Sequence, residues 1–277
     1  MKRYLLAIIG ITTLVGCKQA SNNSEQTPTS AETEQPKEVT VVRKTIPYVG
    51  DFTNITNVSD FDIVFTEGDY SIEVEAPETV IGALRTSIDS GVITFGQLEE
   101  GKNRYLHKDS KGVGTIYVSC PELRVLAVCG KGNFKSEGCI HTSYLHAGVL
   151  DLGNIDIDSV VCETTFRYET TYNGDASFGY VSTGSDALIF QSMAGTITAN
   201  MNVGGALVLN TASTGEAHIT ATAHQADVVA LDDSRCTLDL RTDNLLLSAQ
   251  GTSLVNLKGN IKHKDIKVGK RAKVLQL

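Results

Sequence analysis

The sequence of 277 residues lacks tryptophan, has only 6% aromatic residues and contains only five prolines. A core with few large rings is built mainly from β-branched and aliphatic side chains, which favour regular strands. Basic residues are also in the minority, since 24 lysines and arginines stand against 32 aspartates and glutamates, and the net charge is −8. Phosphate binding needs a basic face, so this composition argues against a nucleic acid partner.

Long apolar runs are absent as well. The run at residues 4–15 is too short to span a bilayer stably. It follows Lys2 and Arg3 and leads into Leu-Val-Gly-Cys at residues 14–17, the pattern of a bacterial lipoprotein signal. We therefore expect a signal peptide over residues 1–16 and a diacylglyceryl group on the sulfur of Cys17. The alternative is a plain secretory signal in which the cysteine is coincidental.

The segment after the predicted signal has almost no apolar side chains. Residues 17–40 cannot bury a core, which predicts a disordered tether. The folded domain is then expected over residues 41–277. Lys18 stands where some lipoproteins carry the aspartate that retains them at the inner membrane. We therefore expect an outer-membrane lipoprotein that faces the periplasm or the cell surface.

Cysteine is scarce and follows no metal-binding pattern. Five cysteines remain beyond Cys17, at Cys120, Cys129, Cys139, Cys162 and Cys236. None forms a C-x-x-C pair, and the spacings match no zinc site. Most lie in apolar strand contexts, where a thiol packs as a small hydrophobic group. Buried thiols are favoured over a disulfide framework, and the best candidate for a bridge is Cys139–Cys162.

The second half of the chain repeats at intervals of 20 or 21 residues. Each repeat opens with a glycine, at Gly132, Gly153, Gly174, Gly195 and Gly215. The next repeat is expected to start at Arg235, with arginine in place of glycine. Short strands at this period predict an all-β parallel β-helix, or β-solenoid, with about 20–21 residues per coil. The repeated glycine is expected to supply a positive-φ corner. An antiparallel β-sandwich is the alternative, although it has no reason to keep one register through five glycines.

The first part of the domain is expected to mix strands with a short helix. Residues 61–66 and 70–75 alternate in polarity on either side of Glu-Gly-Asp, which predicts a β-hairpin. Pro77 opens a predicted helix that extends to Ile88, with apolar residues recurring on one face.

The order of these segments resembles the DUF2807 family, described as "putative auto-transporter adhesin, head GIN domain". The resemblance begins with residues 52–68, continues through the glycine repeats and closes with residues 251–260, so that it covers residues 45–277. It implies a right-handed parallel β-helix, a lipoprotein of the Bacteroidetes cell envelope and an adhesin-type function. Many members carry Gly-Ser-Gly at the turns, whereas this chain has Gly-Lys-Gly, Leu-Gly-Asn and Asn-Gly-Asp. Less uniform corners are therefore expected here.

One acidic group is the best candidate for catalysis. Asp232 and Asp233 could hold a water molecule or a cation, and Arg235 could bind a uronate, as a polysaccharide lyase or hydrolase would require. A solvated turn between coils explains the same residues. The further motifs of polygalacturonases are missing. The sequence therefore assigns no catalytic residue, and it predicts neither a metal site nor a cofactor.

Three tyrosines form the best candidate for ligand binding. Tyr168, Tyr172 and Tyr180 lie near Phe166 and Phe178 in the sequence. On an outer face they could stack on sugar rings or anchor a protein. Alternatively, the phenylalanines fill the core and the tyrosines only cover strands.

These observations favour a non-enzymatic, lipid-anchored envelope protein, an adhesin whose solenoid surface binds a glycan or another envelope protein. A polysaccharide-active lyase or hydrolase is one alternative. A purely structural envelope component is the other.

Overall fold

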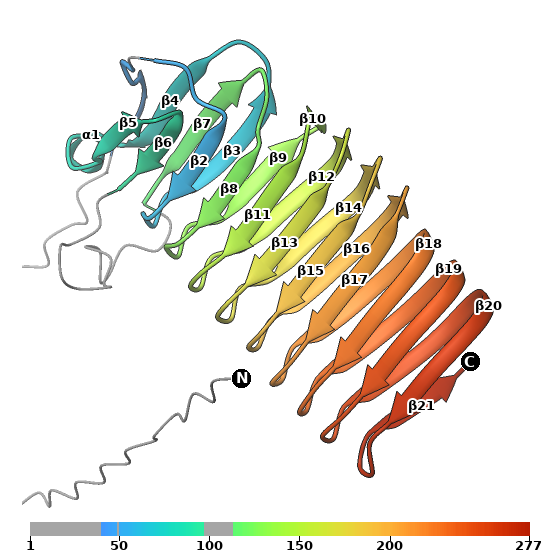
Figure 1. The fold of residues 1–277 in the computed structure, drawn as a ribbon. Helices are drawn as coiled ribbons and strands as arrows, with labels where there is room; N and C mark the ends of the chain where they lie inside the picture. The colour runs from blue at the N-terminus through green and yellow to red at the C-terminus, as the bar shows by residue number, and fades with distance from the viewer. Residues whose placement is uncertain (1–39, 49, 97–112) are drawn as a thin grey trace, which may run out of the picture. The chain divides into compact units, whose positions relative to one another are not determined.

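The computed structural model describes residues 40–48, 50–96 and 113–277, and the predicted signal, Cys17 and nearly all of the predicted tether lie outside them. In this part the chain forms a β-solenoid with 21 strands and a helix of one turn (Figure 1). The all-β class and the solenoid architecture predicted from the sequence are therefore confirmed.

Each coil adds one strand to each of two faces, which we call face A and face B. Face A contains β9 (Phe134–Glu137) and its continuation β10 (Cys139–Thr142), followed by β12 (Ile155–Cys162), β14 (Ala176–Thr183) and β16 (Thr196–Val203). Face B contains β8 (Val125–Val128), β11 (Leu145–Val149), β13 (Phe166–Thr170), β15 (Ala187–Gln191) and β17 (Ala206–Thr211). The next three strands run through both faces: β18 (Glu216–Ala230), β19 (Arg235–Ala249) and β20 (Leu254–Val268). Successive coils pair in parallel on both faces.

The core lies between the two faces and follows the alternation of each strand. In β16, Ile197, Ala199 and Met201 are buried, while Thr198 and Asn200 are exposed. The same inward position is apolar in successive coils, so these side chains stack into ladders along the solenoid axis. Burial of such ladders is the main stabilising contribution in a chain with few aromatic residues.

The coils shorten along the chain. Ile155 lies opposite Ala176, which is 21 residues later, whereas Ala217 lies opposite Cys236, which is 19 residues later. The corner between the faces takes residues 163–165 in one coil but only residues 204–205 two coils later, and β18 turns this corner without leaving the strand. The predicted period holds for the earlier coils, and the later coils lose one or two corner residues.

The repeated glycines serve close stacking rather than a positive-φ corner, which corrects the expectation from the sequence. Of the five, only Gly195 has a positive φ, at +108°. A Cβ on Gly153 would lie 2.3 Å from the carbonyl oxygen of Gly132, and one on Gly174 would lie 2.3 Å from that of Gly153. These positions require glycine because the backbone of the adjacent coil leaves no room for a side chain.

The glycine ladder continues through serine, not through Arg235 as expected. Glu216 pairs with Arg235, so Gly215 lies opposite Ser234, and the next coil places Ser253 there. Both serines are completely buried. Because serine carries a Cβ, the shorter coils leave room at this position that the coils of Gly153 and Gly174 do not.

The predicted hairpin is wrong, because a later strand separates its two arms. β3 (Asp62–Glu67) pairs in parallel with β7 (Thr115–Cys120), and β4 (Ser71–Pro77) pairs with the other edge of β7 in the antiparallel sense. β1 (Val41–Thr45) then adds an antiparallel strand beside β4. Together, β1 and β4 close this end of face A.

The predicted helix is much shorter than its apolar pattern suggested. α1 (Glu78–Ile81) makes one turn and ends at Gly82. Ile88, expected on the helix, lies in β5 (Thr86–Asp89), which forms an antiparallel pair with β6 (Val92–Phe95). β6 and β8 flank β2 (Asn54–Asn57), so these strands begin face B.

All five cysteines beyond Cys17 are free thiols in the structure. Four of them are buried, and Cys139 is partly exposed. Cys139 pairs with Ser159 and not with Cys162, which lies three residues further along β12. This arrangement agrees with the expectation of buried thiols.

Candidate functional site

The acidic candidate lies in the turn between β18 and β19. The side chain of Asp232 accepts a hydrogen bond from the backbone N–H of Ser213 at 3.2 Å, and Asp233 accepts one from the hydroxyl of Thr252. Asp232 also has a positive φ of +57°, a conformation that aspartate tolerates at turns. The two carboxylates therefore link the corners of three successive coils, in agreement with the reading of a solvated turn. Arg235 extends to Glu216 at 4.0 Å.

Tyr168 is a core residue, which corrects the expectation that it faces a ligand. It lies on β13 between Phe166 and Thr170, and all three side chains point inward. The ring of Phe178 makes edge contacts with Phe166 and Tyr168 at centroid distances of 5.0 and 5.5 Å. Burial raises the pKa of the Tyr168 phenol. Phe166 and Phe178 fill the core, as the alternative interpretation held.

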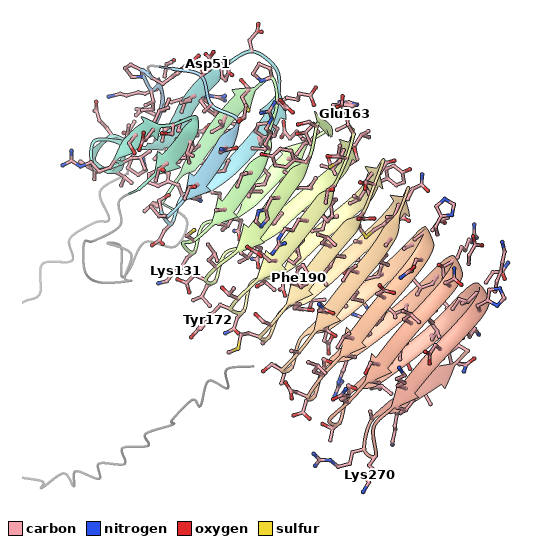
Figure 2. The ribbon with its side chains drawn as sticks, in the orientation of Figure 1. Asp51, Lys131, Glu163, Tyr172, Phe190 and Lys270 are labelled. Carbon is pink, nitrogen blue, oxygen red and sulfur yellow. The ribbon has the colours of Figure 1, made fainter. Side chains whose placement is uncertain are left out.

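The other two tyrosines are exposed but lie in different parts of a coil. Tyr180 lies on face A in β14, whereas Tyr172 lies in the turn after β13. Tyr172 belongs to an apolar ridge that follows one corner of the solenoid and comprises Leu150, Leu152, Tyr172 and Met193, each 41–46% exposed. Figure 2 shows Tyr172 and Lys131 along the same edge of the solenoid.

Face A carries two hollows that sequence reasoning did not identify. The larger, of about 450 Å³, lies over β16, β18, β19 and β20. Its floor includes a ladder of polar side chains in register across these strands: Asn202, Thr222, Arg241 and Asn260. The smaller, of about 270 Å³, lies beside it over β14, β16, β18, β19 and β20 and includes Ser177, Thr198, Asn200 and Thr220. Both are lined by hydroxyls and amides, and Gly179 and Gly204 leave space along them.

The carboxylates beside the hollows are paired with lysines. Asp243 lies 2.6 Å from Lys262 and 3.8 Å from His224, and the hydrogen bond from Lys262 lowers the pKa of Asp243. Asp239 lies 3.2 Å from Lys258 in the smaller hollow. The Asp243 carboxylate therefore remains ionised at neutral pH, so it can accept hydrogen bonds but does not supply a general acid. In the described ranges, no group of three or more histidine, cysteine or acidic side chains could hold a metal ion.

The polar ladder was not predicted from the sequence because the repeat expected at Arg235 was out of register by one residue. A step of 20 residues from Gly215 places Arg241 opposite Ala221, which faces the core. The true step of 19 residues places Arg241 opposite Thr222, which is exposed. A slip of one residue exchanges the inner and outer faces of a strand.

Fold and surface together define a β-solenoid with an extended polar face. The chain belongs to the DUF2807 family, described as "Putative auto-transporter adhesin, head GIN domain", and the family model matches residues 51–275. The resemblance stated from the sequence is therefore confirmed. Among curated proteins, no sequence matches the chain. In the described residues, no helix is long and apolar enough to cross a membrane.

The chain is similar in fold to several solved structures. A protein from Parabacteroides distasonis described as a "putative lipid binding protein" has a TM-score of 0.64 at 17% identity, over 86% of this chain and 96% of that one. A "putative adhesin" from Bacteroides fragilis has a TM-score of 0.58 at 15% identity, over 87% and 98%. Another from Parabacteroides merdae has a TM-score of 0.55 at 14% identity, over 86% and 96%.

Proposed function

We propose that this protein is a non-enzymatic, lipid-anchored adhesin of the outer membrane that binds a glycan along face A. The observation that carries the proposal is the pair of adjoining hollows over β14, β16, β18, β19 and β20, lined by hydroxyls, amides and paired charges. Sugar hydroxyls both donate and accept hydrogen bonds, and such a surface offers partners of both kinds. Its shallow, extended form suits a chain of sugar rings better than a small molecule, which needs an enclosing pocket.

The experiment is a glycan array probed with the soluble domain, residues 40–277. We expect the double variant Asn202→Ala, Arg241→Ala to lose binding, because both side chains lie on the floor of the larger hollow. Asn210→Ala is the matched control, since Asn210 occupies an outward position on face B. Absence of binding to any glycan, or equal loss in the control, would contradict the proposal.

The same array separates face A from the apolar ridge. Tyr172 could stack on a sugar ring, so the double variant Tyr172→Ser, Met193→Ser removes two exposed side chains of the ridge. We expect this variant to keep its glycan binding. Loss of binding here, with retention in the face A variant, would move the glycan site to the ridge.

The enzymatic alternative predicts release of products from uronate polysaccharides, with or without calcium. Activity that disappears in the double variant Asp232→Ala, Asp233→Ala would replace the binding proposal with a lyase or hydrolase. The turn hydrogen bonds of these two residues support the binding proposal instead.

The lipid anchor is tested at Cys17. We expect radiolabelled palmitate to be incorporated into the native protein but not into Cys17→Ala, which would remain an unprocessed precursor. Protease treatment of intact cells then distinguishes the cell surface, where the protein is cut, from the periplasmic side, where it is protected. Equal labelling of Cys17→Ala would exclude the anchor.

A further inference from the structure

The last coil concentrates positive charge in a chain that is acidic overall. Residues 258–273 contain one aspartate and seven basic residues, namely Lys258, Lys262, Lys264, Lys267, Lys270, Arg271 and Lys273. The expectation of a chain without a basic face therefore does not hold at this end. Lys258 and Lys262 are neutralised by aspartates of the preceding coil. Figure 2 shows Lys270 at this end of the solenoid.

The same coil leaves one strand edge free. β21 (Lys273–Gln276) pairs only with Leu254–Leu257, at the beginning of β20. Within residues 40–48, 50–96 and 113–277, no strand pairs with the outer edge of β20 over residues 260–268. Figure 1 shows β21 as a short final strand beside β20. Backbone N–H and C=O groups along such an edge can bind an added strand.

The interior is incompletely covered at this edge. Ile261 and Ile266 occupy inward positions opposite Thr242 and Leu247, but each is only partly buried. Lys264 also occupies an inward position, and its Nζ donates a hydrogen bond to the side-chain oxygen of Gln276 at 3.2 Å. A further strand would cover the two isoleucines and gain the free energy of their burial.

We propose that the free edge of β20, residues 260–268, binds an extended acidic segment of a partner protein as an added strand. Apolar side chains of this segment would cover Ile261 and Ile266, and its outward carboxylates would lie beside Lys267, whose ion pair with Asp265 is long, at 3.9 Å. A second copy of the same edge is disfavoured, because it would bring two lysine-rich strands together. An inward lysine such as Lys264 is a known means of preventing pairing between identical edges.

The test uses the soluble domain and a fluorescent peptide of alternating valine and glutamate, about ten residues long, which is sufficient for one strand. We expect saturable binding, together with protection of the backbone amides of residues 260–268 from hydrogen exchange. The double variant Lys267→Glu, Lys270→Glu should weaken binding at least tenfold. Lys135→Glu is the matched control, since Lys135 is an exposed lysine on β9, far from this coil in the sequence. Asn260 and Lys262 line the larger hollow of face A, but Lys267, Lys270 and Lys135 line neither hollow, so these variants test the free edge without changing the proposed glycan site.

Modified ligands distinguish an added strand from simple charge attraction. The same peptide with alternate backbone nitrogens methylated keeps its charge but cannot pair along one edge, and it should not bind. Equal binding of this peptide, or full displacement by inorganic polyphosphate without amide protection, would overturn the proposal in favour of a site for anions. Concentration-dependent dimerisation that protects residues 260–268 without peptide would overturn it in favour of a second copy.

Discussion

At the residue scale, one position in each coil limits how closely the solenoid can stack. Gly153 and Gly174 lie under the backbone of an adjacent coil, and Ser234 and Ser253 continue their ladder. The requirement at this position is for small size, since most of these residues have an ordinary φ. Substitution by a larger residue therefore forces two coils apart.

We predict that Gly153→Ala lowers the free energy of unfolding by about 1–3 kcal/mol, as overpacking of a core does. The added Cβ would lie 2.3 Å from the carbonyl oxygen of Gly132 and 2.5 Å from Cγ1 of Val128. Urea denaturation of the soluble domain measures the change. Gly68→Ala is the matched control, because its Cβ would meet no atom within 4 Å. Equal stability of the two variants would show that the coils move apart without cost.

The thiols provide a second prediction at this scale. Burial raises the pKa of Cys120 and Cys162 to about 12 and that of Cys129 and Cys236 to about 11. Because the thiolate is the reactive form, we expect only Cys139 to react with Ellman's reagent in the native domain near pH 8. Cys139→Ser should remove this reaction, and denaturant should expose all five thiols. Fewer than five reactive thiols in the denatured protein, measured without reductant, would reveal a disulfide.

At the scale of elements, alternation and period predicted most of the fold, but pairing partners depended on contacts distant in sequence. The segments that became β3 and β4 were correctly identified as strands. Their assignment as a hairpin failed because β7, about 50 residues later, inserts between them. The polar ladder of face A was not predicted for a different reason. The coils become shorter where β18 continues through a corner as a strand, and this changes the register. The order of apolar residues reveals strands, whereas register depends on corner geometry.

A carboxylate that joins two turns gives the stability a specific pH dependence. Glu122, between β7 and β8, accepts hydrogen bonds from Arg124 at 2.6 Å and from the backbone N–H and hydroxyl of Ser143 at 2.9 and 2.7 Å. These hydrogen bonds, of which the one from Arg124 has the largest effect, lower the pKa of Glu122 from 4.5 to about 2. Because the pKa of Glu122 is lower in the folded state, its ionised form stabilises the folded protein at pH values above the pKa of the unfolded state. This contribution is lost as the pH falls from about 4.5 to 2.

We predict that Glu122→Gln lowers the melting temperature near neutral pH and flattens its decrease between about pH 4.5 and 2. Thermal melts across this range, followed by circular dichroism, provide the measurement. Glu163→Gln is the control, since Glu163 is exposed and its side chain has no polar partner in the described part of the chain. Parallel pH profiles for Glu122→Gln and the unmodified domain would show that Glu122 does not stabilise the fold.

At the scale of the whole molecule, a solenoid must protect both of its ends. The first coils carry the antiparallel strands β1, β4 and β5, which interrupt the parallel stacking. The last coil has only the short β21 and a cluster of lysines. At this end, lysines rather than added antiparallel strands protect the free edge from pairing with another molecule. Removal of a lysine that prevents such pairing should therefore make the domain self-associate.

We predict that Lys264→Leu makes the soluble domain self-associate through the free edge of β20. Leucine at this inward position would extend the partly covered surface of Ile261 and Ile266 and remove the hydrogen bond to Gln276. Sedimentation velocity over a range of concentrations should show a dimer for this variant and a monomer for the unmodified domain. Lys267→Leu adds the same apolar side chain at an outward position of the same strand, so it should remain monomeric. If both variants associate equally, apolar surface alone is responsible, and the inward position of Lys264 has no part in keeping the solenoids separate.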